Sequence, residues 1–298
     1  MSVLNEYSHC TLCARECGAD RTKSYGYCRM PATPMLARAA LHMWEEPIIS
    51  GNCGSGTVFF SGCSLGCIFC QNREISSGSI GRAKSTAELS EIMLKLQNEG
   101  AHNINFVTPT HYAPTVIEST QLARALGLSI PIVYNTSSYD TINTIKLLDG
   151  TVDIYLADYK YNLSATAGSY SSAENYPAAA RSAIAEMVNQ KGSAVIENGL
   201  AKSGVIVRIL LLPGHVAEAK LSVKYLYEAY GDSIYISLMN QYTPMPNMPP
   251  PLNRRVTSAE YSELVDYALS KGIKNAFIQE GGTASESFIP AFDFTGIE

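Results

Sequence analysis

Apolar runs and amphipathic stretches alternate along most of the chain from residue 57 onward. Short runs rich in β-branched and aromatic residues predict strands, and the longer stretches between them carry apolar residues at helical spacing. The predicted strands are Thr57–Ser61, Asn103–Thr108, Pro131–Asn135, Val152–Ala157, Gly204–Leu212, Ser233–Met239 and Asn275–Gln279. The predicted helices are residues 86–98, 114–126, 139–148, 177–190, 216–230 and 257–271.

The predicted strands are continuously apolar, and Val205–Leu212 is the clearest case. Strands of this kind suit a parallel sheet that is covered on both faces, and parallel neighbours need crossover helices. The alternation therefore predicts an α/β fold with a partial (β/α)6 barrel over residues 51–298. Residues 1–50 lack such periodic segments and predict a loop-rich, Cys-rich N-terminal module.

Polar and ionisable side chains follow the predicted strands. Because ligands bind at the carboxyl ends of parallel strands, we expect these side chains on one rim of the sheet. The proline-rich stretch 242–251 predicts a stiff loop near the same rim. The candidate site residues are Cys63, His111, Asn135, Ser137, Asp158, Lys160, His215 and Gln241, of which His215 is expected to be structural.

Charge and hydropathy narrow the class of protein. The net charge of −5 and the pI near 5.6 leave no basic field for a nucleic-acid partner. No apolar run approaches the roughly 20 residues that span a bilayer, and the first residues carry no export signal. We therefore expect a cytoplasmic protein with no membrane partner.

All eight cysteines lie within the first 70 residues of the 298. Disulfide frameworks occur mostly in short secreted chains that are too small to build a core. A long chain without an export signal favours metal ligation instead.

Three cysteines, Cys63, Cys67 and Cys70, form a Cys-x3-Cys-x2-Cys loop after the first predicted parallel strand. Thiolates at this spacing can hold a [4Fe–4S] cluster, and three ligands leave one iron open. S-adenosylmethionine can bind an open iron through its amino and carboxylate groups, and one electron then cleaves its sulfonium. The alternative is a structural zinc site with a fourth ligand.

Four further cysteines, Cys10, Cys13, Cys17 and Cys28, provide a complete ligand set for zinc or for a second [4Fe–4S] cluster, which the spacing does not separate. The remaining Cys53 is expected to be a buried core thiol, with an exchange ligand or a substrate-facing group as the alternatives.

At the Cys63 loop the chain resembles the radical S-adenosylmethionine superfamily, and more closely the PflX-like relatives of the pyruvate formate-lyase activating enzymes. The resemblance covers nearly the whole chain. Its motifs are Cys10-Thr-Leu-Cys13, Gly26-Tyr-Cys28, Glu45-Glu46-Pro47, Phe59-Phe-Ser-Gly-Cys63, Cys70-Gln-Asn72, Val107-Thr-Pro-Thr-His111, Tyr134-Asn-Thr-Ser137, Asp158-Tyr-Lys160 and Gln241-Tyr-Thr-Pro244.

The resemblance implies roles in binding S-adenosylmethionine. Val107-Thr-Pro-Thr-His111 replaces the Gly-Gly-Glu motif that receives its amino group in the activating enzymes, so Thr108, Thr110 and His111 become candidates for that contact. His111 is also the candidate catalytic residue, with a backbone-bonded loop histidine as the alternative. Lys160 is expected to pair with the cofactor carboxylate. The other expected cofactor contacts are Asn135, Ser137, Asp158, Arg208 and Gln241.

The resemblance also implies an activity. A 5′-deoxyadenosyl radical is expected to abstract hydrogen from a substrate, with a flavodoxin or ferredoxin-type protein as electron donor. The substrate is expected to be a glycyl radical enzyme that the protein activates, or else a small metabolite or a peptide. A metal-binding protein without catalysis is the alternative from another class.

Overall fold

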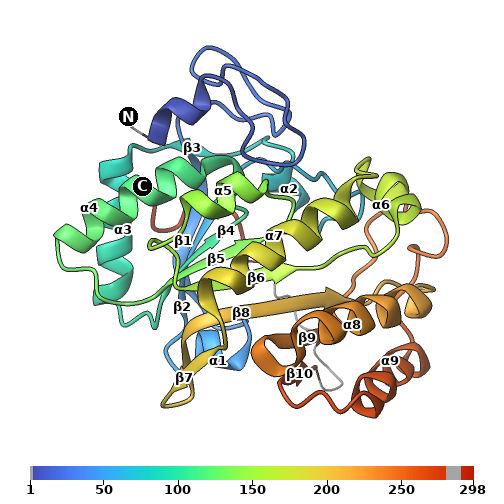
Figure 1. The fold of residues 1–298 in the computed structure, drawn as a ribbon. Helices are drawn as coiled ribbons and strands as arrows, with labels where there is room; N and C mark the ends of the chain where they lie inside the picture. The colour runs from blue at the N-terminus through green and yellow to red at the C-terminus, as the bar shows by residue number, and fades with distance from the viewer. Residues whose placement is uncertain (1–2, 280–289) are drawn as a thin grey trace.

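The computed structural model describes residues 3–279 and 290–298, and one mixed sheet runs through it (Figure 1). Its parallel strands follow the predicted apolar runs, and each run forms a strand. The bounds are β2 Ser55–Phe60, β4 Ile104–Val107, β5 Ile132–Thr136, β6 Ile154–Asp158, β8 Leu200–Leu210, β9 Tyr235–Met239 and β10 Ala276–Ile278.

The strand order is β10-β9-β8-β6-β5-β4-β2-β1-β3, in which every neighbouring pair from β10 to β2 is parallel. This order is that of a partial β/α barrel, and the predicted α/β fold is confirmed. A short strand, β7 Val195–Glu197, pairs antiparallel with the start of β8.

Helices fill the crossovers between the parallel strands, as predicted. Capping boxes begin two of them, with Ser85 and Glu88 at the first and Thr257 and Glu260 at the second. None of the helices in the described residues combines the length and apolar content needed to cross a bilayer. The long helices are α3 Thr86–Asn98, α4 Ala113–Ala125, α7 Tyr176–Lys191, α8 Val216–Tyr230 and α9 Ser258–Ser270. The short helices are α1 Pro47–Ser50, α2 Arg73–Ser76, α5 Ile142–Leu147 and α6 Ser164–Ser171, and 3₁₀ turns lie at Val3–Tyr7, Thr110–Tyr112 and Gly231–Ser233.

One edge of the sheet was not predicted. Strand β1, Met35–His42, pairs antiparallel with β2 and with the short β3, Arg82–Ala83. Its sequence, MLARAALH, contains no β-branched residue, so local propensity does not favour a strand there. The sheet thus begins before residue 51, and the expected division after residue 50 does not coincide with its edge.

Side chains of the parallel strands alternate between two faces, as the pleat requires. The outer face packs under the helices in the main core and includes Phe106, Tyr134 and Val207. The inner face is apolar near the strand starts, where Val133, Leu156 and Ile206 share a second cluster with Ile49 of α1. Polar residues replace the apolar ones further along the same face: Asn105, Asn135, Asp158, Arg208 and Ser237.

The segment after β1 closes the lower part of the inner face. Ile49 has no exposed surface, and its cluster covers the apolar starts of β5, β6 and β8. Because α1 lies there, the two residues before Pro47 form a floor beneath the carboxyl ends of the strands.

The N-terminal cysteine-rich loops pack against one side of the barrel, where Figure 1 shows them in blue. Two arginines fix them. Arg21 is buried and donates to the backbone oxygens of Met30, Pro31 and His111. Arg15 donates to the backbone oxygens of Ser64 and Leu65, inside the Cys63–Cys70 loop.

Candidate functional site

A cavity of about 500 Å³ opens on the inner face, at the carboxyl ends of the strands where the sequence predicted it. Most of the predicted site residues line it. They are Cys63, Cys67, Cys70, Thr108, Asn135, Ser137, Asp158, Lys160, Arg208 and Gln241.

The three thiols are set by a tight turn after β2. Gly62 has a φ of 82°, and a Cβ added there would lie 2.7 Å from the backbone oxygen of Cys28. Only glycine fits this position. Two donors already point at the sulfurs: the Leu65 amide lies 3.4 Å from Cys63 Sγ, and the Ser171 hydroxyl donates to Cys67 Sγ at 3.0 Å.

The chemistry of these thiols suits an iron–sulfur cluster. Burial and the neighbouring thiols raise the pKa of Cys63, and they raise the pKa of Cys70 to about 11. Three adjacent thiolates therefore form only beside a strongly positive partner, which iron provides. In the described parts of the chain, no three Cys, His, Asp or Glu side chains converge on one point as they do around a single ion.

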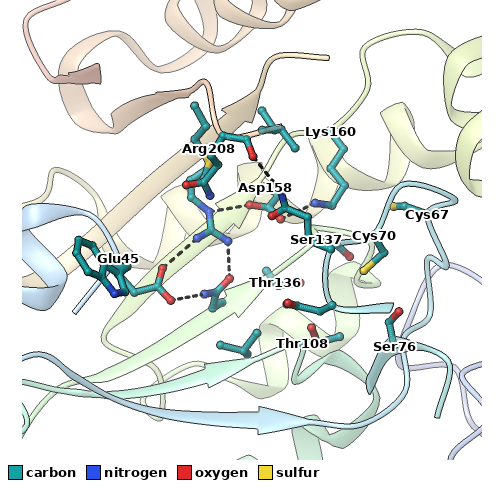
Figure 2. Close-up of a pocket in the computed structure, with 18 of the residues that line it drawn as sticks. Glu45, Cys67, Cys70, Ser76, Thr108, Thr136, Ser137, Asp158, Lys160 and Arg208 are labelled. Atoms are coloured by element: carbon teal, nitrogen blue, oxygen red, sulfur yellow. Dashed lines mark hydrogen bonds and ion pairs between the residues drawn. The ribbon is translucent and has the colours of Figure 1, made fainter. Parts of the chain in front are cut away.

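Arg208 is the centre of a buried ionic network (Figure 2). Its Nε lies 2.7 Å from Asp158 Oδ1, its Nη1 lies 3.1 Å from Glu45 Oε2, and its Nη2 donates to Asn135 Oδ1 at 2.6 Å. Burial alone would raise the pKa of Asp158, but Arg208 and Lys160 outweigh it and hold that pKa below its ordinary value. Asp158 is thus ionised at neutral pH.

Lys160 lies between this network and the thiols. Its Nζ donates to Asp158 Oδ2 at 2.7 Å, and Figure 2 shows it on the side of Cys67 and Cys70. Burial lowers the pKa of Lys160, but Asp158 and Cys67 raise it by more. The ammonium is therefore charged; it carries three donors, and it lines the cavity.

Two acidic residues that sequence reasoning did not place in the site, Glu45 and Glu46, form the cavity floor. Asn105 donates to Glu45 at 2.9 Å. Burial raises the pKa of Glu45 despite its ion pair, because Arg208 is shared with Asp158. The sequence did contain one sign of a polar inner face, where buried acidic residues could be bonded. Asn105 and Ser237 are polar residues within otherwise apolar central strands.

Two predicted cofactor contacts lie elsewhere. Thr110 and His111 are buried outside the cavity lining, and Thr110 bonds to Thr136 instead. Nε2 of His111 donates to the backbone oxygen of Ser61, and burial lowers the pKa of His111 to about 3. The backbone-bonded alternative for His111 therefore fits the structure, because the turn after Pro109 carries its ring into the core.

The four N-terminal cysteines lie in the same loops, outside the cavity lining. Burial raises the pKa of Cys13 to about 12, with contributions from Cys10, Cys28 and Cys17. Arg21 Nη1 lies 3.8 Å from Cys10 Sγ. Cys53, expected in the core, is exposed instead, because the turn after α1 carries it to the surface. His215 bonds to Tyr170 and Glu218, in keeping with the structural role expected for it.

Comparisons with known proteins bear on this fold and site. Residues 57–163 match the family model of the Radical SAM superfamily. The chain is 26% identical over 275 residues to the uncharacterized protein MJ0674 of Methanocaldococcus jannaschii. The aligned region covers 89% of this chain and 75% of the relative.

Solved structures resemble the fold at low identity. The structure of native anSMEcpe with bound AdoMet and Kp18Cys peptide aligns with a TM-score of 0.51 and 12% identity, over 73% of this chain and 60% of that one. Methylornithine synthase (PylB) aligns with a TM-score of 0.50 and 15% identity, over 90% of this chain and 69% of that one. The chain thus spans less than two thirds of the anSMEcpe chain.

The fold is a partial β/α barrel with a three-cysteine loop after its first parallel strand, and charged side chains line its inner face. These features define the class of cofactor-dependent barrel enzymes. Residues 57–163, which contain this loop, are the part of the chain that matches the Radical SAM superfamily, in keeping with its motifs. The radical SAM domain implies a [4Fe–4S] cluster and S-adenosylmethionine as cofactors.

Proposed function

We propose that the protein binds S-adenosylmethionine in the cavity, against a [4Fe–4S] cluster held by Cys63, Cys67 and Cys70, and abstracts a hydrogen atom from a substrate. Such a cluster, when bound, passes one electron to the sulfonium, whose carbon–sulfur bond breaks to give methionine and a 5′-deoxyadenosyl radical. The supporting observation is the charged Lys160, held by Asp158 beside the thiols.

Lys160 would orient the cofactor. Its free donors can reach a carboxylate that sits next to the thiols, and a bond between an ammonium and a carboxylate is charge-assisted. Asp158 holds the ammonium in place, and Arg208 holds Asp158 from the other side. The network therefore fixes the position of Lys160 before the cofactor arrives.

Aromatic side chains exclude water beside the thiols. Phe69, which lies between Cys67 and Cys70 in the chain, packs edge-on against Tyr161, Tyr170 and Tyr242, with ring centroids 6.4, 6.3 and 6.1 Å apart. A dry wall of this kind protects a reactive radical from side reactions.

Production of 5′-deoxyadenosine tests the proposal. Anaerobically reconstituted protein given dithionite and S-adenosylmethionine should form it, as measured by mass spectrometry, and Cys67→Ala should form none. Lys160→Met should raise the concentration of S-adenosylmethionine needed for half-maximal rate by about tenfold or more, because a charge-assisted bond is lost. Lys224→Met, on an exposed face of α8, is the matched control. A wild-type protein with a full cluster and no 5′-deoxyadenosine would overturn the proposal.

The resemblance to activating enzymes supports a glycyl radical enzyme as the substrate, with a flavodoxin or ferredoxin-type protein as electron donor. Paramagnetic resonance of a candidate partner after the reaction should then show a glycyl radical. A small metabolite or peptide as substrate would give 5′-deoxyadenosine without that signal.

A further inference from the structure

The charged side chains that line the cavity do not balance among the described residues. Besides the cysteines, the carboxylates of Glu45, Glu46 and Asp158 face the cations of Lys160 and Arg208. Arg208 pairs with Glu45 and Asp158, and Lys160 pairs with Asp158. Among the described residues, no cationic nitrogen forms an ion pair with Glu46, although Arg208 is near enough for its charge to lower the pKa of the Glu46 carboxyl group.

Glu46 is buried and incompletely bonded. Its residue is 8% exposed, and Oε2 has no hydrogen-bond partner in the part of the chain that the structure describes. The Ser237 hydroxyl bonds to its carboxyl group. Buried polar atoms are nearly always bonded, so an unpartnered carboxylate oxygen beside a cavity points to a ligand that supplies the missing donor.

The position of Glu46 separates it from the cofactor end of the cavity. Along the sheet, Asp158 is paired with Arg208, and Arg208 with Ser237. Lys160 lies on the thiol side of Asp158, whereas Glu46 bonds to Ser237 beyond Arg208. A group that reaches Glu46 therefore lies across Arg208 from the thiols.

We propose that Glu46 binds a cationic nitrogen, an ammonium or guanidinium group, of the substrate. This inference rests on the proposed function, since it places the substrate opposite S-adenosylmethionine. Trp44, Phe59 and Phe277 also line the cavity and provide apolar surface for the carbon chain that carries the cation. Burial raises the pKa of Glu46, and a bound cation stabilises its charged form.

A matched pair of probes tests this site. 4-Phenylbutylamine carries a cation, and 4-phenylbutanol replaces it with a neutral hydroxyl. Trp44 is the only tryptophan of the chain and lines the cavity, so its fluorescence in the reconstituted protein reports binding. The wild type should bind the amine about tenfold or more tightly than the alcohol, as expected of a charge-assisted bond.

The variant Glu46→Gln should abolish this preference, because it removes the charge and keeps the shape. Glu91→Gln, on the exposed face of α3, should retain it. Equal affinities of the wild type for the two probes would overturn the inference, and this comparison holds even where Glu46→Gln fails to fold.

Binding of S-adenosylmethionine separates this inference from the proposed function. Glu46→Gln should bind the cofactor as the wild type does. A loss of cofactor affinity with an unchanged amine preference would assign Glu46 to the cofactor and overturn the inference. Amine preference in a wild type that forms no 5′-deoxyadenosine would uphold the cation site and overturn the radical function.

Discussion

Arg208 illustrates how much of this site depends on a single side chain. Its guanidinium contacts two carboxylates and one amide from three separate segments, which the planar fork of arginine allows and a lysine does not. The side chains of both carboxylates are at most 19% exposed, so neither turns freely to water when the arginine is removed. The arginine therefore stabilises the fold as well as the cavity.

Replacing Arg208 with methionine should cost about 3–5 kcal/mol of the free energy of unfolding, because it leaves the Glu45 carboxylate without its ion pair and Asp158 with Lys160 alone. The side chains of Arg208 and Glu45 are 12% and 9% exposed, so solvent screens the pair little. Denaturant unfolding measures the change. Lys220→Met, which breaks an exposed pair with Glu263, should cost less than about 1 kcal/mol. A loss of that small size for Arg208→Met would show that the network contributes little.

At the scale of elements, the N-terminal loops hold the thiol loop in place. Arg15 donates to the backbone oxygens of Ser64, Leu65, Ser171 and Ser172. The first two belong to the thiol loop, and Ser171 is the residue whose hydroxyl donates to Cys67 Sγ. One side chain thus connects the cysteine-rich module, the thiol loop and α6.

Removing Arg15 should loosen the thiol loop. We expect amide hydrogens of residues 63–70 in Arg15→Ala to exchange roughly tenfold faster, because several charge-assisted bonds are lost together. Lys23→Ala removes an exposed cation of the same module and should leave the loop unchanged. Hydrogen exchange with mass spectrometry measures both, and equal rates in the two variants would contradict a fastening role.

The elements differ in how well the sequence predicts them. Each parallel strand was predictable because its run is mostly apolar, with few polar interruptions, and the thiol loop because its spacing is distinctive. Strand β1 was not, since its alanine-rich sequence becomes a strand only through pairing with β2. Glu45 and Glu46 join the site only because α1 packs inside the barrel, a contact with no local signature.

At the scale of the molecule, two groups of cysteines occupy separate places. One lines the cavity, and the other lies in the N-terminal loops that Arg15 and Arg21 attach to the barrel. Different segments position the cavity cysteines and the N-terminal cysteines. We therefore expect that a variant which loses metal at one group can keep metal at the other.

Metal analysis of anaerobically purified protein tests this separation. Cys67→Ala should lose about four irons per chain, the content of one [4Fe–4S] cluster. We expect the N-terminal cysteines to bind zinc or a second cluster; that metal should then stay in Cys67→Ala and be lost from Cys13→Ala, which should keep the four irons. If either variant loses the metal of both cysteine groups, the two groups depend on one another.

The closed floor restricts how a reactant reaches the chemistry. Ile49 and its neighbours fill the amino ends of β5, β6 and β8, so no polymer can thread through the barrel from that end. A long peptide would have to insert a side chain, a terminus or a hairpin tip from the opposite rim and withdraw it along the same route. The cavity would then recognise only the part of the substrate that enters it, and the rest of the substrate sequence could vary.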